Sequence, residues 1–210
     1  MLAFWATFAA LSIIVIICDR KYSMLRDQSV ATPQPYSWSR VQLAWWSVII
    51  LSSFISIFLT SQGYQVPSLS TSTLILLGIS GATTVTARTI DVSDASNNAV
   101  RHQDSPSQNF LLDILSDSNG ASVHRFQAIV FNFVFGCWFI VQTIRNINGD
   151  VSPDLIMPVI SDQNLVLLGL SSATYAAMKT TENKSNSVNP NPSSTPTAVT
   201  STTTTNTTTV

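Results

Sequence analysis

The sequence predicts an all-α membrane protein with about five transmembrane helices. Charged residues make up only 10% of its 210 residues, whereas a soluble domain has about 25%. Apolar residues reach 45%, and mean hydropathy is +0.28 although the end of the chain is almost wholly polar. The few charges are also segregated along the chain. A chain with so little charge cannot cover the surface of a soluble globule of this size.

The gaps between charges mark the predicted spans. No Asp, Glu, Lys or Arg occurs in residues 2–18, 41–87, 126–144 and 163–178. A hydrocarbon core of about 30 Å takes roughly 17–25 apolar helical residues per crossing. The second gap is about twice that length, and the polar and proline residues near Pro67 interrupt it, so it predicts a helical hairpin. The predicted spans are 2–18, 42–60, 71–88, 126–145 and 163–179.

Two alternatives to this arrangement do not fit the sequence. Buried helices of a soluble domain would show polar faces with regular charges, and these segments have none. A cleaved signal peptide at 2–18 would need a basic start and a small-residue cleavage site, which are missing. A lipoprotein reading of Cys18 fails because Ile17 stands where a small residue is required. The first span therefore predicts an uncleaved anchor.

Basic residues predict the orientation. Nine of the ten Lys and Arg residues fall at the side that carries segments 19–41, 89–125 and 180–210, and Arg145 alone falls at the other. Positive charge is enriched in cytoplasmic loops. We expect a multi-pass membrane protein with the N-terminus outside and the C-terminus in the cytoplasm.

The chain also carries a predicted internal duplication. Three landmarks recur in the same order, an Arg-x-Gln start, a proline and a Leu-Leu-Gly helix motif: Arg40 and Arg125, Pro67 and Pro158, Leu76–Thr83 and Leu167–Thr174. Each repeat contains two crossings, so both repeats point the same way and form two parallel two-helix units. Chance similarity between apolar segments is the alternative.

The predicted organisation has five parts. They are an anchor and loop (1–34), repeat one (35–88), a cytoplasmic connector with a short amphipathic helix from Phe110 (89–123), repeat two (124–182) and a disordered Ser/Thr-rich tail (183–210). The tail cannot bury apolar area. Its two N-glycan sequons are not expected to be used, because the charge count puts the tail inside.

Small residues repeat at a helical spacing in the third and fifth spans. Gly78 and Ala82 lie four positions apart, and so do Gly169 and Ala173. Such pairs let helix backbones approach closely. We expect these helices to pack against each other or across a subunit interface. The alternative is that Gly and Ala are simply frequent in such helices.

Two arginines and two tryptophans are predicted to contact lipid headgroups. Arg40 and Arg125 open their helices at the cytoplasmic boundary, and Trp45 and Trp46 lie near the same boundary. A ligand-binding arginine pair is the alternative. For Asn132 we expect an interhelical hydrogen bond rather than a place in a pore lining.

No pattern in the sequence predicts chemistry. The histidines and cysteines are scattered, and no metal-ligand spacing, phosphate loop or nucleophile–base set appears. We therefore expect no enzyme activity, catalytic residue, cofactor or metal. A net charge of −1 argues against nucleic-acid binding. No ionisable residue is expected at mid-membrane, which argues against a pump.

Three segments carry a resemblance: 35–42 (PYSWSRVQ), 76–83 (LLGISGAT) and 110–127 (FLLDILSDSNGASVHRFQ). They resemble a group of uncharacterised bacterial multi-pass inner-membrane proteins. The resemblance spans roughly residues 35–178. It implies a bacterial inner-membrane setting and supplies no activity.

Two functions remain open at this point. The first is a membrane anchor or assembly component, with the lipid bilayer, further copies of itself and an unidentified cytoplasmic protein as partners. The alternative is an oligomeric passive channel or pore for a small solute or ion, lined by Ser80, Thr83, Ser171 and Thr174.

Overall fold

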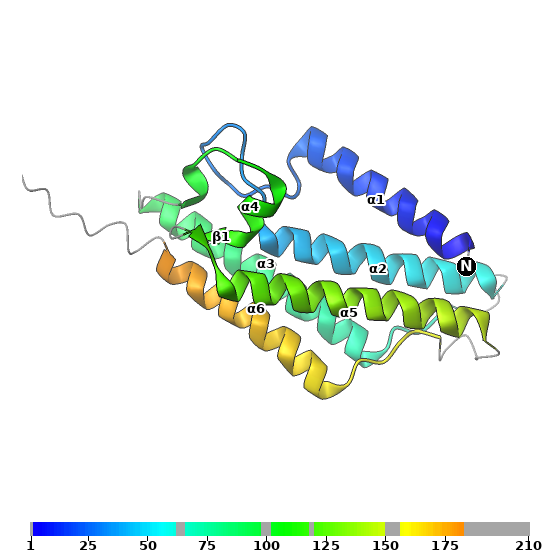
Figure 1. Ribbon diagram of the computed structural model, residues 1–210. Coiled ribbons are helices and arrows are strands. Elements are labelled where there is room, and N and C mark those ends of the chain that lie inside the picture. The colour runs from blue at the N-terminus through cyan, green and yellow to red at the C-terminus, as the bar shows by residue number, and fades with distance from the viewer. Residues whose placement is uncertain (1, 62–65, 98–101, 118–119, 150–155, 183–210) are drawn as a thin grey trace, which may run out of the picture.

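The computed structural model describes residues 2–61, 66–97, 102–117, 120–149 and 156–182. Within them, successive long helices run back and forth along one axis (Figure 1). The long helices are α1 (Leu2–Tyr22), α2 (Trp38–Thr60), α3 (Thr71–Ser96), α5 (Val123–Asn148) and α6 (Asp162–Glu182). The helical architecture agrees with the all-α prediction.

Four of the described helices are long and apolar enough to cross a membrane: α1, α2, α3 and α5. The protein is therefore a membrane-embedded helical protein. Helix α6 has 21 residues, and at about 1.5 Å per residue it matches a core of about 30 Å. It is less apolar, because Ser, Thr and the charged Asp162 and Lys179 dilute its Leu and Val side chains. The fifth crossing stays a prediction.

The predicted hairpin at 41–87 is confirmed. Helix α2 ends at Thr60 and α3 begins at Thr71. The Ser70 side chain caps α3 by accepting a hydrogen bond from the Thr73 backbone N–H at 3.2 Å. Helix α3 then continues past the predicted end at residue 88 to Ser96, because nothing in that polar segment breaks a helix.

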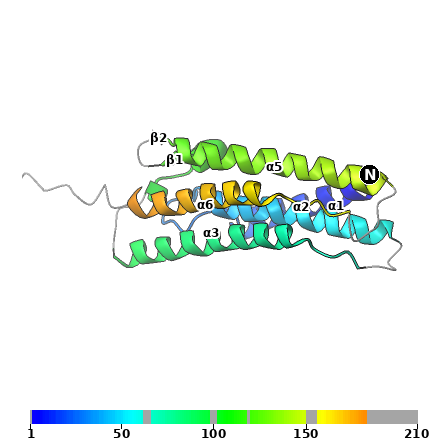
Figure 2. The same cartoon turned by 90° about the horizontal axis from the view of Figure 1, so that it is seen from below.

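The helices of the two predicted repeats contact one another in a closed ring, and Figure 2 shows α2 and α6 between α3 and α5. Helix α2 contacts α3 and α5, and α6 contacts the same two helices. Helix α1 lies outside the ring and packs against α2. Each predicted repeat thus corresponds to one helix pair, α2 with α3 and α5 with α6. The duplication itself stays a prediction.

Matching non-helical segments lead into α3 and α6. Pro67 and Pro158, the predicted counterparts, are both buried. The two segments touch: the Ile160 backbone N–H donates to Ser72 Oγ at 3.0 Å, and Ser70 Oγ donates to the Pro158 carbonyl at 3.4 Å. These bonds satisfy polar groups that would otherwise be buried without partners.

Tryptophans tie α2 to α5 in the bundle core. Trp46 is fully buried, and its indole N–H donates to Asn132 Oδ1 at 2.7 Å. The Trp45 indole N–H donates to the Asn132 carbonyl at 3.2 Å, and the ring lies directly over Gly136. The predicted interhelical hydrogen bond of Asn132 is confirmed. Gly136 is required because a Cβ there would come within 2.5 Å of the Trp45 ring.

The connector between α3 and α5 is compact in its described part. It contains a short 3₁₀ helix η1 (His102–Asp104), helix α4 (Phe110–Leu115) and the two-residue strands β1 (Ser116–Asp117) and β2 (Gly120–Ala121). The short helix expected from Phe110 is present, but it ends at Leu115 because the chain turns into the β1–β2 pair. The predicted tail, 183–210, lies outside the described residues.

Candidate functional site

A buried ion cluster lies at the end of the bundle where the connector is located. The Lys179 ammonium lies 3.0 Å from the Asp91 carboxylate and 3.3 Å from Asp27 Oδ2. Lys179 and Asp91 are each 2% exposed, and Asp27 is 8% exposed. Two carboxylates and one ammonium thus share a site that is almost closed to solvent.

Three separate elements bring these charges together. Lys179 stands in the last turn of α6, and Asp91 stands near the end of α3. Asp27 belongs to the loop between α1 and α2, where its backbone N–H donates to the Pro35 carbonyl at 2.8 Å. Gln103 of η1 adds a donor to Asp91 Oδ1 at 2.6 Å. The cluster therefore fastens the α1–α2 loop and the connector to the ends of α3 and α6.

Electrostatic pairing offsets the cost of burying Asp27. Burial by itself raises the pKa of this carboxyl, but the Lys179 ammonium and hydrogen bonds from neighbours that include Ser37 outweigh it. The net effect is a pKa below the ordinary value of 3.8. Asp27 is therefore ionised, and its charge is held by the Lys179 ammonium.

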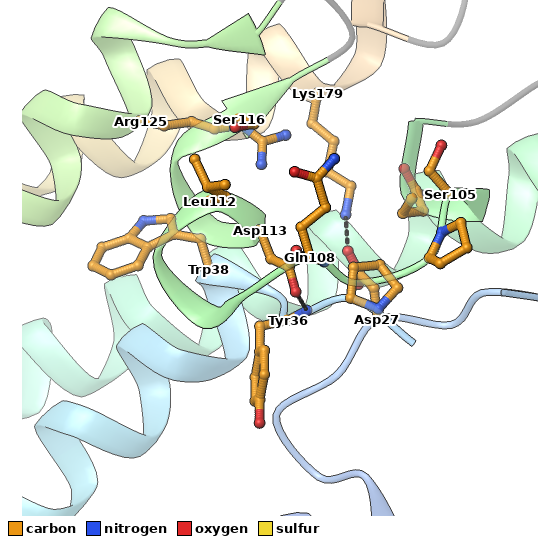
Figure 3. A pocket seen from close by; sticks show the side chains of 13 residues that line it. Asp27, Tyr36, Trp38, Ser105, Gln108, Leu112, Asp113, Ser116, Arg125 and Lys179 are labelled. Carbon is orange, nitrogen blue, oxygen red and sulfur yellow. Dashed lines mark hydrogen bonds and ion pairs between the residues drawn. The ribbon is translucent and has the colours of Figure 1, made fainter. Parts of the chain in front are cut away.

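A small polar cavity of about 80 Å³ lies beside the cluster (Figure 3). Asp27 and Lys179 line it together with Trp38 from α2, Asp113 from α4 and Arg125 from α5. Asp113 receives backbone N–H bonds from Tyr36 and Gln108, each 3.2 Å long. The volume is enough for a few water molecules, so the cavity supports hydrated ion pairing rather than binding of a large ligand.

The small residues that were predicted to pack have different surroundings. Gly78 and Ala82 are exposed on α3, and a Cβ added at Gly78 would meet nothing within 4 Å. Gly169 is half-buried, with Ile79 Cδ1 of α3 3.5 Å from its ideal Cβ, while Ala173 is exposed. Helices α3 and α6 do pack together, but Gly78 and Ala82 do not make that contact. Their packing between copies stays a prediction.

Two of the four predicted headgroup anchors lie elsewhere. Trp46 is in the core, and Arg125 is 7% exposed with its guanidinium 5.5 Å from the centre of the Tyr175 ring. Both face the bundle interior, because α2 and α5 turn these sides toward each other and toward α6. Arg40 and Trp45 are half-exposed, which leaves them accessible to lipid.

The ion cluster is not predicted by any pattern in the sequence. Asp27, Asp91 and Lys179 each read as an ordinary loop charge or boundary charge next to a span. The one feature of the sequence that could have pointed to the cluster is the predicted topology, which puts all three residues at the same side of the membrane. Within the described ranges, no group of three His, Cys, Asp or Glu side chains is placed to hold a metal ion.

Comparisons with family models, with curated proteins and with solved structures return no match for this chain.

Proposed function

We propose that this protein is an integral membrane anchor or assembly component that self-associates through the outer faces of α3 and α6. The observation that carries the proposal is an open apolar groove of about 510 Å³ between these two helices. Ile75 and Ile79 line it on one side, and Leu165, Gly169 and Ala173 line it on the other.

The groove has the shape that a second helix needs. Gly169 lines the groove without a side chain, and the exposed small residues Gly78 and Ala82 lie on α3 beside it. In a membrane, helices associate by close packing of small residues, since the lipid is as apolar as the protein surface. One charged residue, Asp162 in the first turn of α6, also lines the groove. It is exposed at the start of the helix, so a helix from another copy would gain this packing along the apolar remainder.

Substitution of Gly78 tests the proposal. Gly78→Leu has room in the single chain, because a Cβ there meets nothing within 4 Å. It should therefore leave the fold intact and block a partner helix, weakening association at least about tenfold. Ala9→Leu, on the exposed side of α1, is the matched control. Subunit counting by photobleaching in liposomes measures the outcome, and equal subunit numbers in all three proteins would refute the proposal.

We also propose the orientation with the N-terminus outside, in a bacterial inner membrane. The arrangement in Figure 1 supports it, because the α1–α2 loop, the connector and the end of α6 gather at one end. Nine of ten basic residues belong to those segments or flank them, as the positive-inside rule expects. The bacterial setting rests on the sequence resemblance alone.

We also propose that the connector binds a protein partner on the cytoplasmic side. Phe110, Leu111 and Leu112 of α4 are all exposed, by 41%, 61% and 42%. The ion cluster joins the α1–α2 loop to the ends of α3 and α6, and it lines the same cavity as α4. Exposed apolar side chains on an ordered support are typical of an interaction surface.

A passive pore remains the second candidate because of one observation. In the described part of the chain, the buried hydroxyls of Ser52, Ser56, Ser80 and Ser171 have no hydrogen-bond partner, and buried hydroxyls of this kind are commonly satisfied by water. Of the four predicted lining residues, Ser80, Thr83 and Ser171 are buried within the single chain and Thr174 is exposed. A pore between copies would therefore need further lining residues beside Thr174. Reproducible selective flux through liposomes with pure protein would favour this candidate over assembly.

A further inference from the structure

A second groove, of about 420 Å³, runs between α1, α2 and α3. Its walls are apolar and include Leu11 and Ile14 of α1 and Leu43, Val48 and Leu51 of α2. Two charged side chains line it, and both are arginines: Arg40 of α2 and Arg88 of α3. An apolar groove with cationic groups at one end has the chemistry of a phospholipid site.

The packing of α3 on α2 brings the two arginines together. Thr84 Oγ1 donates to the Ser39 carbonyl at 3.0 Å. Ser39 directly precedes Arg40, and Thr84 stands one helical turn before Arg88, on the same side of α3. Within the described residues, neither guanidinium makes a hydrogen bond or ion pair. Two cationic groups therefore line one groove, and no anionic side chain among the described residues pairs with them.

The length of the groove fits one leaflet. Along α2 it extends from Arg40 to Leu51, which is about 16 Å at 1.5 Å per residue. That is about half of a 30 Å hydrocarbon core. An acyl chain anchored by its headgroup at the level of Arg40 would lie along the whole groove and end near the bilayer centre.

We propose that this groove binds one anionic glycerophospholipid, with the headgroup phosphate between Arg40 and Arg88 and an acyl chain along the wall of α1 and α2. Arginine pairs suit this role because a planar guanidinium donates two parallel hydrogen bonds to phosphate oxygens. Ordinary boundary lipid would contact the outside of any apolar helix. The groove and the paired arginines distinguish a retained lipid from that boundary layer. The proposal does not depend on self-association.

Native mass spectrometry of the full chain in detergent tests the site. Phosphatidylglycerol and phosphatidylcholine are titrated separately, and the bound copies are counted. We expect one phosphatidylglycerol to bind at least about tenfold more tightly than phosphatidylcholine, because each nearby arginine adds attraction to an anionic headgroup. Arg40→Gln with Arg88→Gln should remove this preference. Arg20→Gln with Arg145→Gln lowers the net charge equally at exposed positions and should keep it.

A second variant separates the acyl groove from charge alone. Ala44 lines the groove, and Ala44→Phe should fill it while leaving both arginines in place. We expect this variant to lose the tightly bound lipid as well. Inorganic phosphate should not displace the lipid, since it cannot occupy the apolar wall.

Three outcomes would overturn the proposal. The first is equal binding of the two lipids, which indicates boundary lipid only. The second is full retention in the Arg40 and Arg88 double variant. The third is a wild-type dimer that carries no lipid and that Ala44→Phe dissociates, which would assign the groove to a second copy of the chain.

Discussion

The Lys179 ammonium lies 3.0 Å from the carboxylate of Asp91, 88 positions earlier in the chain. The contact joins the end of α6 to the end of α3, and both groups are 2% exposed. A buried charge that loses its partner remains desolvated with nothing to offset the cost. This pair is therefore a place where a single substitution should be felt by the whole bundle.

Removal of the lysine should destabilise the protein strongly. Lys179→Met leaves Asp91 and Asp27 buried without their cation, and the expected cost is about 3–5 kcal/mol. Thermal unfolding in detergent measures it. Lys21→Met, at an exposed position of α1, should be nearly neutral. Adding Asp91→Asn to Lys179→Met should recover part of the loss, and an unchanged melting temperature in Lys179→Met would contradict the ion cluster.

Acid should weaken the cluster through Asp27. The pKa of Asp27 in the fold lies below its ordinary value, so the ionised form stabilises the folded state. That contribution is complete above the ordinary, unfolded pKa of 3.8 and is lost as pH falls through the lower, folded pKa. Lys179, Asp91 and Ser37 are the groups that face it.

The comparison of Asp27→Asn with wild type measures this effect. Wild type should be the more stable of the two at pH 7, and the difference should shrink toward pH 3. Asp162→Asn, at an exposed position, controls for general acid effects. A difference that stays constant with pH would show that Asp27 does not contribute through its charge.

Gly136 should tolerate no side chain. In Gly136→Ala the new Cβ would lie 2.5 Å from Trp45 Nε1, so the indole must move and lose its bond to the Asn132 carbonyl. Overpacking of this kind typically costs about 1–3 kcal/mol. Gly81→Ala is the matched control, since nothing lies within 4 Å of its added Cβ. Thermal unfolding that ranks the two variants equally would contradict the close contact.

The fifth crossing can be tested by reporter fusions. If α6 crosses the membrane, a fusion after Gly149 and a fusion after Glu182 should lie on opposite sides. We expect alkaline phosphatase to be active after Gly149 and a fluorescent protein to be bright after Glu182, because the positive-inside rule puts the latter in the cytoplasm. Each reporter is therefore fused at both positions. If a reporter gives the same result after Gly149 and after Glu182, α6 does not cross the membrane and its predicted orientation is wrong.

The distribution of charged and apolar residues along the chain was enough to predict the long helices. Charge-free stretches mark α1, α2, α3 and α5, because a helix in lipid must satisfy its own backbone and present apolar side chains all round. The break near Pro67 followed from the same reasoning. The single amide of Asn132 in an apolar span was enough to predict an interhelical bond, since a buried amide needs a partner.

Orientation of the side chains around each helix needed the tertiary structure. The tryptophan pair at 45 and 46 reads as an interfacial belt, yet Trp46 points to Asn132 in the core. Arg125 likewise reads as a lipid anchor and instead lies over Tyr175. Hydropathy reports how apolar a helix is as a whole, and it does not say which side meets a neighbouring helix.

The sequence by itself determined that the chain is a helical membrane protein and where its apolar segments lie. The reason is that the transfer of a segment into lipid depends on the side chains of that segment alone. Only the tertiary structure decided that Asp27, Asp91 and Lys179 share one buried site and that Arg40 and Arg88 border one groove. These pairings join residues on different helices and loops, up to 152 positions apart. Their distances depend on how the ring of helices closes, which no local pattern contains.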